Sequence, residues 1–557
     1  MSKARTSDLW WKNSIVYCLD VETFLDSDGD GHGDFEGLTD RVDYLAGIGV
    51  TCIWLMPFFP SPNRDDGYDI TDYYAVDPRL GSLGEFVAFV RTAQDRGIRV
   101  IVDLVVNHTS DQHEWFRKAR ASRNSPYRDW YVWADEPPEQ PVAEVVFPDA
   151  EDSIWTWDER AGQWYLHHFY SHQPDLNIGN PAVREEIAKI AGFWLQLGVD
   201  GFRVDAVPYL IETGGTQPNG QIALDPHELL RDLRSFMSRR RGDSVLLGEV
   251  NLPPKQLVDY FGDDDEFELL FDFPLMQAMY LGLARGDSRP IRKAIERRPA
   301  TPDDAQWAIF VRNHDELTLD QLSERERTEV FEAFGPEKDM QLYDRGLRRR
   351  LPPMMGGEPA RVRLVYSLLF SLPGTPVLFY GEEIGLGENL DVDGRLSVRT
   401  PMQWTDERAG GFSTAPPSRL PRPLPDGEYG PLAVNVADQR RTADSLLNWM
   451  ERIIRRRNET PELGWGAVSL LDADDDAVLA HRCDWEGSAV VTVHNLDAAP
   501  REVSIDLADT DGFETMVDLL DTEAAPHELD GHTVDFKLSG YGHHWFRLLR
   551  SDHTAPP

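Results

Sequence analysis

Three acidic residues, each at the end of a short apolar run, are the strongest candidates for chemistry in this sequence. They are Asp205 in the run 201–207, Glu249 in the run 244–250, and Asp315 after the run 308–314. Arg203 precedes Asp205 by two residues, so both side chains are expected on one side of a strand, where the cation would keep the carboxylate ionised. Such a carboxylate suits a nucleophile, but it also suits a structural ion pair. This segment alone leaves both interpretations open.

The elements that would position these carboxylates follow a regular pattern. Short runs that are apolar on both faces alternate with amphipathic helical patterns, as parallel strands covered by helices do. Eight repeats of strand and helix predict an α/β fold, a (β/α)8 TIM barrel. The eight runs are 14–21, 51–57, 99–107, 201–207, 244–250, 268–273, 308–314 and 376–382.

Polar residues gather at the C-terminal ends of these runs, which is the face where barrel enzymes have their active sites. They are Asn107 and His108, Arg203 and Asp205, Glu249, His314 and Asp315, and Glu382 and Glu383. So many polar groups at one face are improbable as independent core ion pairs. Their placement favours the catalytic interpretation of the three carboxylates.

Insertions and a change of pattern divide the chain. The barrel is assigned to residues 1–107 and 176–462. Residues 108–175, rich in Trp, Pro and Asp, predict a subdomain inserted after the third strand, over the barrel mouth. Residues 317–359 predict an insertion after the seventh strand. Residues 463–557 show short alternating strands with turn signals, which predict a C-terminal antiparallel β domain.

The composition is strongly acidic: 96 Asp and Glu face 56 Lys and Arg, for a net charge of −40. This charge repels nucleic acid and anionic membranes, so neither is expected as a partner. No apolar run is long enough to span a bilayer, and the polar N-terminus has no secretory pattern, which indicates a cytoplasmic protein. Dispersed carboxylates with few lysines favour adaptation to high salt (a halophilic protein). An acidic protein from a GC-rich genome is the alternative.

The strand-end motifs occur in an order that resembles the signature regions of the α-amylase family of glycoside hydrolases (family 13). They are Asp103-Leu-Val-Val-Asn107-His108, Gly201-Phe-Arg203-Val-Asp205, Gly248-Glu249-Val250 and Arg312-Asn313-His314-Asp315, with Gln173-Pro-Asp175-Leu-Asn177 similar to a fifth. The resemblance covers essentially the whole chain and implies a retaining mechanism. It makes Asp205 the nucleophile, Glu249 the general acid/base and Asp315 a ligand of ring hydroxyls. The apolar stretch around Glu249 should raise its pKa.

The resemblance also implies a pocket for one glucose unit. Its substrate-binding residues would be Asp65, Tyr68, His108, Arg203, His314 and Arg399. Asp65 would bind the far hydroxyls, Tyr68 would stack on the ring, and Arg399 would pair with Asp65 to shut the pocket. The two histidines would donate to the sugar, and Arg203 would orient the nucleophile. A pocket shut in this way implies an exo-acting enzyme.

A separate acidic motif indicates a metal. Residues 26–34 alternate carboxylates with glycine, a spacing that can fold several oxygen ligands around one cation, although the Glu that ends an EF-hand loop is missing. In the family this loop binds a cation, so the resemblance implies Ca²⁺, or Mg²⁺, at Asp26, Asp28, Asp30, His32 and Asp34. A metal-free acidic turn is the alternative. A second Ca²⁺ between Asn107 and Asp175 is also implied, and no organic cofactor is expected.

Longer runs resemble the branch of the family that converts maltose into trehalose. These runs are 172–177, 203–209, 312–319, 399–404, 435–439, 445–450 and 540–547. They imply intramolecular α-glucosyl transfer by double displacement, with some hydrolysis to glucose, on maltose, trehalose or short α-glucosides. Segments 387–397 and 414–432 depart from that pattern where the acceptor sugar is expected. An exo-acting α-glucosidase or transglucosidase is therefore the alternative, and an inactive carbohydrate-binding relative is a third. A homo-oligomer is left open.

Overall fold

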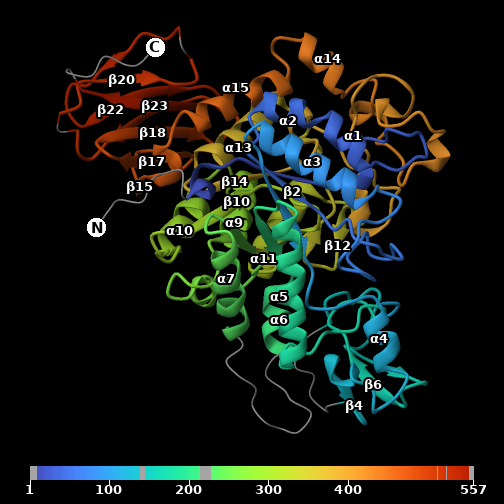
Figure 1. Ribbon diagram of the computed structural model, residues 1–557. Coiled ribbons are helices and arrows are strands. Elements are labelled where there is room, and N and C mark those ends of the chain that lie inside the picture. The colour runs from blue at the N-terminus through green and yellow to red at the C-terminus, as the bar shows by residue number, and fades with distance from the viewer. Residues whose placement is uncertain (1–8, 138–144, 214–226, 511, 522, 551–557) are drawn as a thin grey trace.

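The protein is described by a computed structural model that covers residues 9–137, 145–213, 227–510, 512–521 and 523–550 (Figure 1). Eight parallel strands form a closed barrel in the order β1-β14-β10-β9-β8-β7-β3-β2. They are β1 (Val16–Leu19), β2 (Cys52–Leu55), β3 (Arg99–Leu104), β7 (Gly201–Val204), β8 (Val245–Gly248), β9 (Leu269–Phe271), β10 (Gln306–Phe310) and β14 (Thr375–Phe379). Each overlaps a predicted run, so the TIM-barrel prediction is confirmed.

The barrel strands are mostly apolar because they are covered on both faces. Every residue of β1, β2, β7, β8, β9 and β14 is buried. The outer layer includes α3 (Leu83–Asp95), α5 (Pro181–Gln196), α7 (Glu228–Arg240), α9 (Phe273–Arg285) and α13 (Pro359–Ser371). Ser82 and Glu85 form a capping box that starts α3, and Asn180 caps α5 ahead of a proline at its first position. These local signals fix where the helices begin.

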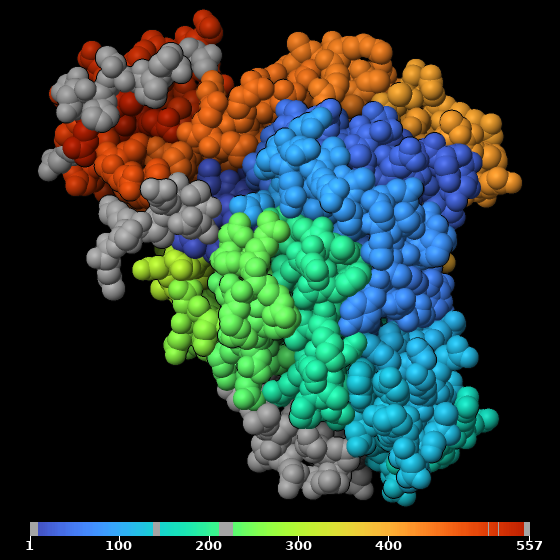
Figure 2. Space-filling model, viewed as in Figure 1, coloured from blue at the N-terminus to red at the C-terminus, as the bar shows by residue number. Residues whose placement is uncertain are grey.

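Two insertions extend from the carboxyl ends of the strands. After β3 the chain forms α4 (Glu114–Ala119) and an antiparallel sheet of β4 (Trp133–Ala134), β5 (Trp155–Asp158) and β6 (Gln163–Leu166), which protrudes from the barrel in Figures 1 and 2. After β10 it forms α11 (Glu324–Phe334) and a small sheet of β11 (Leu317–Thr318), β12 (Gln341–Leu342) and β13 (Gly346–Leu347). A bridge between His108 and Asp175 joins the two ends of the first insertion.

The C-terminal region forms the predicted antiparallel β domain, which lies beside the barrel in Figures 1 and 2. Its strands make a six-stranded sheet, β15-β17-β18-β23-β20-β21, and a three-stranded sheet, β16-β19-β22. Their bounds are β15 (Ala467–Leu470), β16 (Asp472–Ala473), β17 (Val478–Trp485), β18 (Ser488–Asn495), β19 (Arg501–Asp506), β20 (Thr515–Asp518), β21 (His527–Glu528), β22 (Thr533–Leu538) and β23 (His543–Leu549). Buried Trp545 belongs to the barrel's apolar core and donates to Ser367 on α13 over 3.0 Å. Apolar packing therefore joins the domain to the barrel.

Within the described ranges, no helix combines the length and the apolar character needed to cross a membrane.

Candidate active site

A cavity of about 400 Å³ lies at the carboxyl ends of the barrel strands. Its walls include the three predicted catalytic carboxylates and three of the predicted substrate-binding residues: Asp205, Glu249, Asp315, Asp65, Tyr68 and His108. The other three predicted substrate-binding residues, Arg203, His314 and Arg399, are buried next to these groups. The barrel thus brings together residues that are up to 334 positions apart in the sequence, the separation of Asp65 and Arg399.

Arg203 neutralises three carboxylates with two nitrogen atoms. Its side chain is 1% exposed, and Nη1 donates to Asp205 over 2.7 Å and to Asp103 over 3.0 Å. Nη2 lies 2.8 Å from Glu249 Oε2. The arginine therefore orients Asp205 and also sets the position of Glu249. Asp103 was not among the predicted site residues, although it begins one of the strand-end motifs.

Glu249 has the pKa of a group that can both give and take a proton near neutral pH. Burial raises its pKa to about 7, in the direction predicted from its apolar stretch; Arg203 opposes this shift, and the charges of Asp205 and Asp315 reinforce it. The N–H of Ala206 donates to Glu249 Oε2 over 3.1 Å. Ala206, next to the proposed nucleophile, has a φ of 50°. Residues other than glycine rarely adopt this left-handed backbone conformation.

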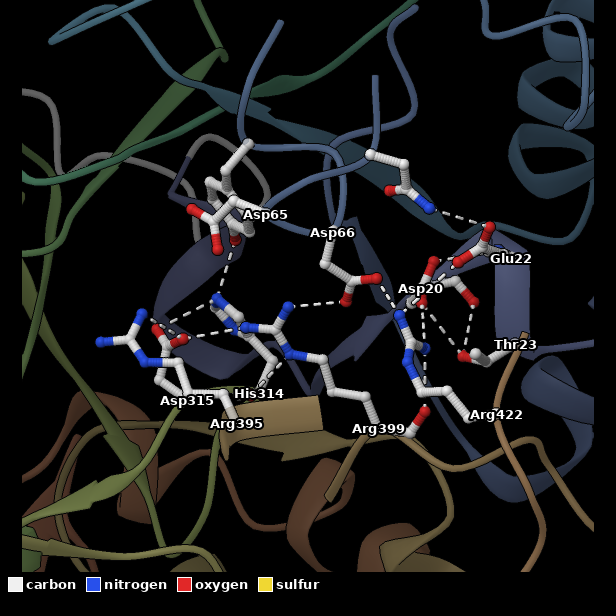
Figure 3. Close-up of polar contacts among 12 residues, drawn as sticks. Asp20, Glu22, Thr23, Asp65, Asp66, His314, Asp315, Arg395, Arg399 and Arg422 are labelled. Atoms are coloured by element: carbon white, nitrogen blue, oxygen red, sulfur yellow. Dashed lines mark hydrogen bonds and ion pairs between the residues drawn. The ribbon is translucent and has the colours of Figure 1, made fainter. Parts of the chain in front are cut away.

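Asp315 is held by three basic side chains (Figure 3). Arg395 and Arg399 lie 3.0 and 2.9 Å from Oδ1, and His314 Nε2 lies 3.2 Å from Oδ2. Burial alone would raise the pKa of Asp315, but the guanidinium groups of Arg395 and Arg399 hold it well below its usual range. Asp315 is therefore an ionised acceptor that lines the cavity, as a ligand of sugar hydroxyls should be.

The aromatic residues Tyr68, His314 and His108 form a hydrogen-bonded cluster at the pocket. The Tyr68 hydroxyl donates to Asp103 over 2.9 Å and lies 2.7 Å from His314 Nε2. The Tyr68 and His314 rings are parallel, with centroids 5.7 Å apart. His108 Nε2 lies 3.2 Å from the Tyr68 carbonyl oxygen, and burial lowers the pKa of both histidines. Both are neutral at pH 7, so they can hydrogen-bond a sugar without carrying charge.

The predicted ion pair between Asp65 and Arg399 is wrong. Arg399 Nη1 lies 2.6 Å from Asp66, and its Nη2 holds Asp315. Asp65 instead accepts a hydrogen bond of 2.8 Å from Gln173, and burial raises its pKa to about 7. The reason is the backbone: Asp66 has a φ of 50° and points toward Arg399 (Figure 3), while Asp65 faces the cavity.

Arg395 is a site residue that the sequence analysis missed. It lies on the 3-10 helix η7 (Gly394–Val398), and besides Asp315 it contacts Glu316 over 2.7 Å. Its guanidinium stacks on Phe147 of the first insertion, 4.8 Å from the ring centroid. The only sequence signal was its position in segment 387–397, which departs from the pattern of the resembled branch.

The acidic loop that precedes α1 (Phe35–Asp40) gathers part of the predicted metal-ligand set. Carboxylate oxygens of three predicted ligands, Asp26, Asp28 and Asp34, lie within 4.8 Å of one another. Asp30 is outside this group, and His32 turns away, with Nδ1 3.2 Å from Glu22. Three clustered carboxylates are hard oxygen donors, so they fit Ca²⁺ or Mg²⁺. His32 does not fit as a ligand.

The second predicted metal site has a different arrangement. Asn107 donates to Asp175 Oδ1 over 3.2 Å, and the His168 ring contacts Asp175 Oδ2 directly. Asn107 Oδ1 has no hydrogen-bond partner among the described residues, yet both Asp175 oxygens are engaged. Asn107 Oδ1 is thus an oxygen donor without a partner in the described ranges, beside an Asp175 whose two oxygens already have contacts, and the second cation stays a prediction.

A closed parallel barrel with three convergent carboxylates at its carboxyl face fits an enzyme that acts on glycosidic bonds. Residues 20–332 and 348–466 match the family described as "Alpha amylase, catalytic domain", and residues 487–547 match "Sucrose hydrolase-like, C-terminal domain". The chain belongs to the α-amylase family of glycoside hydrolases.

Relatives of nearly the same length carry a common description. The trehalose synthase/amylase of Mycobacterium tuberculosis is 42% identical, over 98% of this chain and 92% of its own. The trehalose synthase of Pimelobacter sp. is 40% identical, over 98% of this chain and 97% of its own. The crystal structure of a trehalulose synthase variant in complex with Tris superposes with a TM-score of 0.77 at 27% identity, covering 97% of this chain and all of that one.

Proposed function

We propose that this enzyme converts maltose into trehalose by intramolecular α-glucosyl transfer and releases some glucose by hydrolysis. The observation that carries the proposal is the cavity, in which Asp205, Glu249 and Asp315 face a common space of about 400 Å³. That volume is within the range of small-ligand pockets, roughly 300–1,000 Å³. The full-length similarity to trehalose synthases supports the choice of maltose as substrate.

In the first step the non-reducing glucose of maltose binds between Asp315 and Asp65, above the Tyr68 ring. Asp205 attacks the anomeric carbon while Glu249 gives its proton to the departing glycosidic oxygen. The product is a glucosyl ester on Asp205 and one free glucose. Arg203 keeps the two carboxyl groups in register because it is bonded to both.

In the second step the released glucose stays in the cavity and turns over. Its anomeric hydroxyl loses a proton to Glu249 and attacks the anomeric carbon of the glucosyl ester, which breaks the bond to the Asp205 oxygen and gives α,α-trehalose with net retention. A pKa of about 7 suits Glu249 to both roles. Water that reaches the ester before the glucose does gives hydrolysis instead.

We also propose that the loop before α1 holds a Ca²⁺ or Mg²⁺ ion with a structural role. Asp26, Asp28 and Asp34 would be its protein ligands. Bound there, the ion would supply positive charge to a cluster of three carboxylates. Asp26 also accepts a hydrogen bond from Ser413, so the ion would stabilise the contact between this loop and the region after β14.

Incubation with maltose and quantitative product analysis test the proposal. Trehalose as the main product, with glucose as the minor one, supports it, and the same mixture should form when the reaction starts from trehalose. Glucose alone would identify an exo-acting α-glucosidase, and a longer glucoside would identify an intermolecular transglucosidase. Asp205→Asn is the control, because it should abolish every one of these reactions.

A further inference from the structure

Next to the pocket lies a buried cluster of charged groups that the proposed mechanism does not use. Asp20, Glu22 and Asp66 have side chains that are only 8%, 6% and 4% exposed. One oxygen of each lies within 4.8 Å of the others, a spacing that would suit a metal ion. Three buried carboxylates this close repel one another strongly unless a cation lies among them.

The cation in this cluster is the guanidinium of Arg422 (Figure 3). Its side chain is 5% exposed, with Nη1 3.5 Å from Asp20 and Nη2 3.5 Å from Glu22, and Nη2 also contacts Asp66 directly. Nη1 donates to the carbonyl oxygen of Arg399 over 3.0 Å. Arg422 therefore touches all three carboxylates and the backbone of a pocket residue.

Other groups facing the cluster complete its charge balance. Arg79 and His32 contact Glu22, and the Thr23 hydroxyl donates to Asp20 over 3.2 Å. None of these side chains reaches Asp66 among the contacts of the described residues. Asp66 therefore depends for its neutralisation on Arg422 and on Arg399.

A continuous chain of ion pairs leads from the cluster to the pocket. Asp66 contacts Arg422 through Oδ1 and Arg399 through Oδ2, the latter at 2.6 Å. The second terminal nitrogen of Arg399 lies 2.9 Å from Asp315, which faces the cavity. The position of Asp315 is thus tied to Arg422 through two intermediate side chains, each of which has both terminal groups engaged.

We propose that Arg422 is a positioning residue that acts as the built-in cation of the Asp20, Glu22 and Asp66 cluster and, through Asp66 and Arg399, fixes Asp315 against the sugar. The inference rests on the proposed glucosyl chemistry. Without Arg422, Asp66 has Arg399 as its only cationic partner and draws it away from Asp315. The hydroxyl contacts of Asp315 matter most in the distorted transition state, so kcat should fall more than KM rises.

The test compares Arg422→Ala and Arg422→Lys with Arg419→Ala, an exposed arginine on the same loop. Initial rates are measured on maltose and on an aryl α-glucoside, with fold checked by circular dichroism. Arg422→Ala should lower kcat by roughly 10- to 100-fold, as expected for a misplaced binding group, and millimolar guanidinium should restore part of it. Arg422→Lys, which cannot contact three carboxylates at once, should lose less, and Arg419→Ala should be unchanged.

Unchanged kcat in folded Arg422→Ala, or an equal loss in Arg419→Ala, would overturn the proposal. If Arg422→Ala does not fold, the test rests on Arg422→Lys. A wild-type kcat in Arg422→Lys would then overturn the proposal. A double variant with Asp66→Asn gives a further readout: if the two residues act through one chain, their effects on kcat are far from additive, whereas additive losses contradict the chain. Because the aryl glucoside reports glucosyl-ester formation with any acceptor, these outcomes stand even if maltose yields no trehalose.

Discussion

The pH dependence of catalysis should follow the titration of Glu249. Burial raises the pKa of this residue from 4.5 to about 7, so close to half of the enzyme carries the proton needed for leaving-group departure at pH 7. At an ordinary pKa of 4.5 the protonated fraction at pH 7 would be about 0.3%, roughly 150-fold less. We therefore expect kcat/KM for maltose to fall about tenfold per pH unit above a midpoint near 7.

A second substrate isolates the role of that proton. α-Glucosyl fluoride has a leaving group that departs without protonation, so its rate of glucosyl-ester formation should not show the basic limb. Initial rates on both substrates between pH 5 and 9 provide the comparison. A maltose profile that stays flat to pH 9, or an identical basic limb with the fluoride, would refute the assignment of Glu249 as the acid.

The raised pKa of Glu249 also predicts that the free energy of unfolding falls as the pH rises from 4.5 to 7. Because the folded-state pKa is raised, the folded protein holds a proton that the unfolded chain releases between pH 4.5 and 7. The ionised carboxylate therefore destabilises the fold above pH 7 and not below pH 4.5. Glu249→Gln should raise the free energy of unfolding by up to about 3 kcal/mol at pH 8, and by little at pH 4.5, as urea titrations at the two pH values would show.

Three further measurements follow from charge and burial. With a net charge of −40, the melting temperature should rise as KCl is increased to molar levels, whereas sucrose at matched osmolality should not reproduce the salt effect if screening is its cause. Asp28→Ala should abolish the stabilisation of the fold by added Ca²⁺, whereas Asp30→Ala, in the same loop but outside the cluster, should retain it; equal loss in both would contradict the ligand set. Burial lowers the pKa of His481 and His543 in the C-terminal domain to about 4. The free energy of unfolding should therefore be highest above pH 6.5 and decrease as pH falls toward 4. A urea midpoint that stays constant over this interval would contradict the burial of the two histidines as neutral groups.

The barrel could be predicted because each of its strands corresponds to a short apolar run in the sequence. A strand that is covered on both faces is apolar at most positions, and such runs are visible in the sequence. The positions that interrupt them, such as Asp205 and Glu249, stand out for the same reason. The direction of parallel strands then assigns these residues to one face of the barrel without knowledge of any contact.

The ion-pair partners of the charged side chains could not be predicted from local sequence patterns. Asp65 and Asp66 are adjacent and identical in type, and only the left-handed backbone at Asp66 decides which of them meets Arg399. Arg395 and Arg422 come from irregular segments that have no periodicity, so the sequence places these segments near the acceptor sugar but does not show which carboxylates the two arginines meet. Arg422 meets Asp20 across 402 positions of the chain.

The sequence by itself therefore determined the barrel and the face to which the three carboxylates belong, because these depend on local patterns of burial along each strand, and its motifs indicated the class of chemistry through their resemblance to a family. The tertiary structure alone decided how the charges are shared: one arginine for three carboxylates at Arg203, two arginines on Asp315, and Arg422 among Asp20, Glu22 and Asp66. Ion pairs depend on the distances between side chains that come from segments far apart in the sequence. Those distances exist only once the barrel has closed and brought the loops to one face.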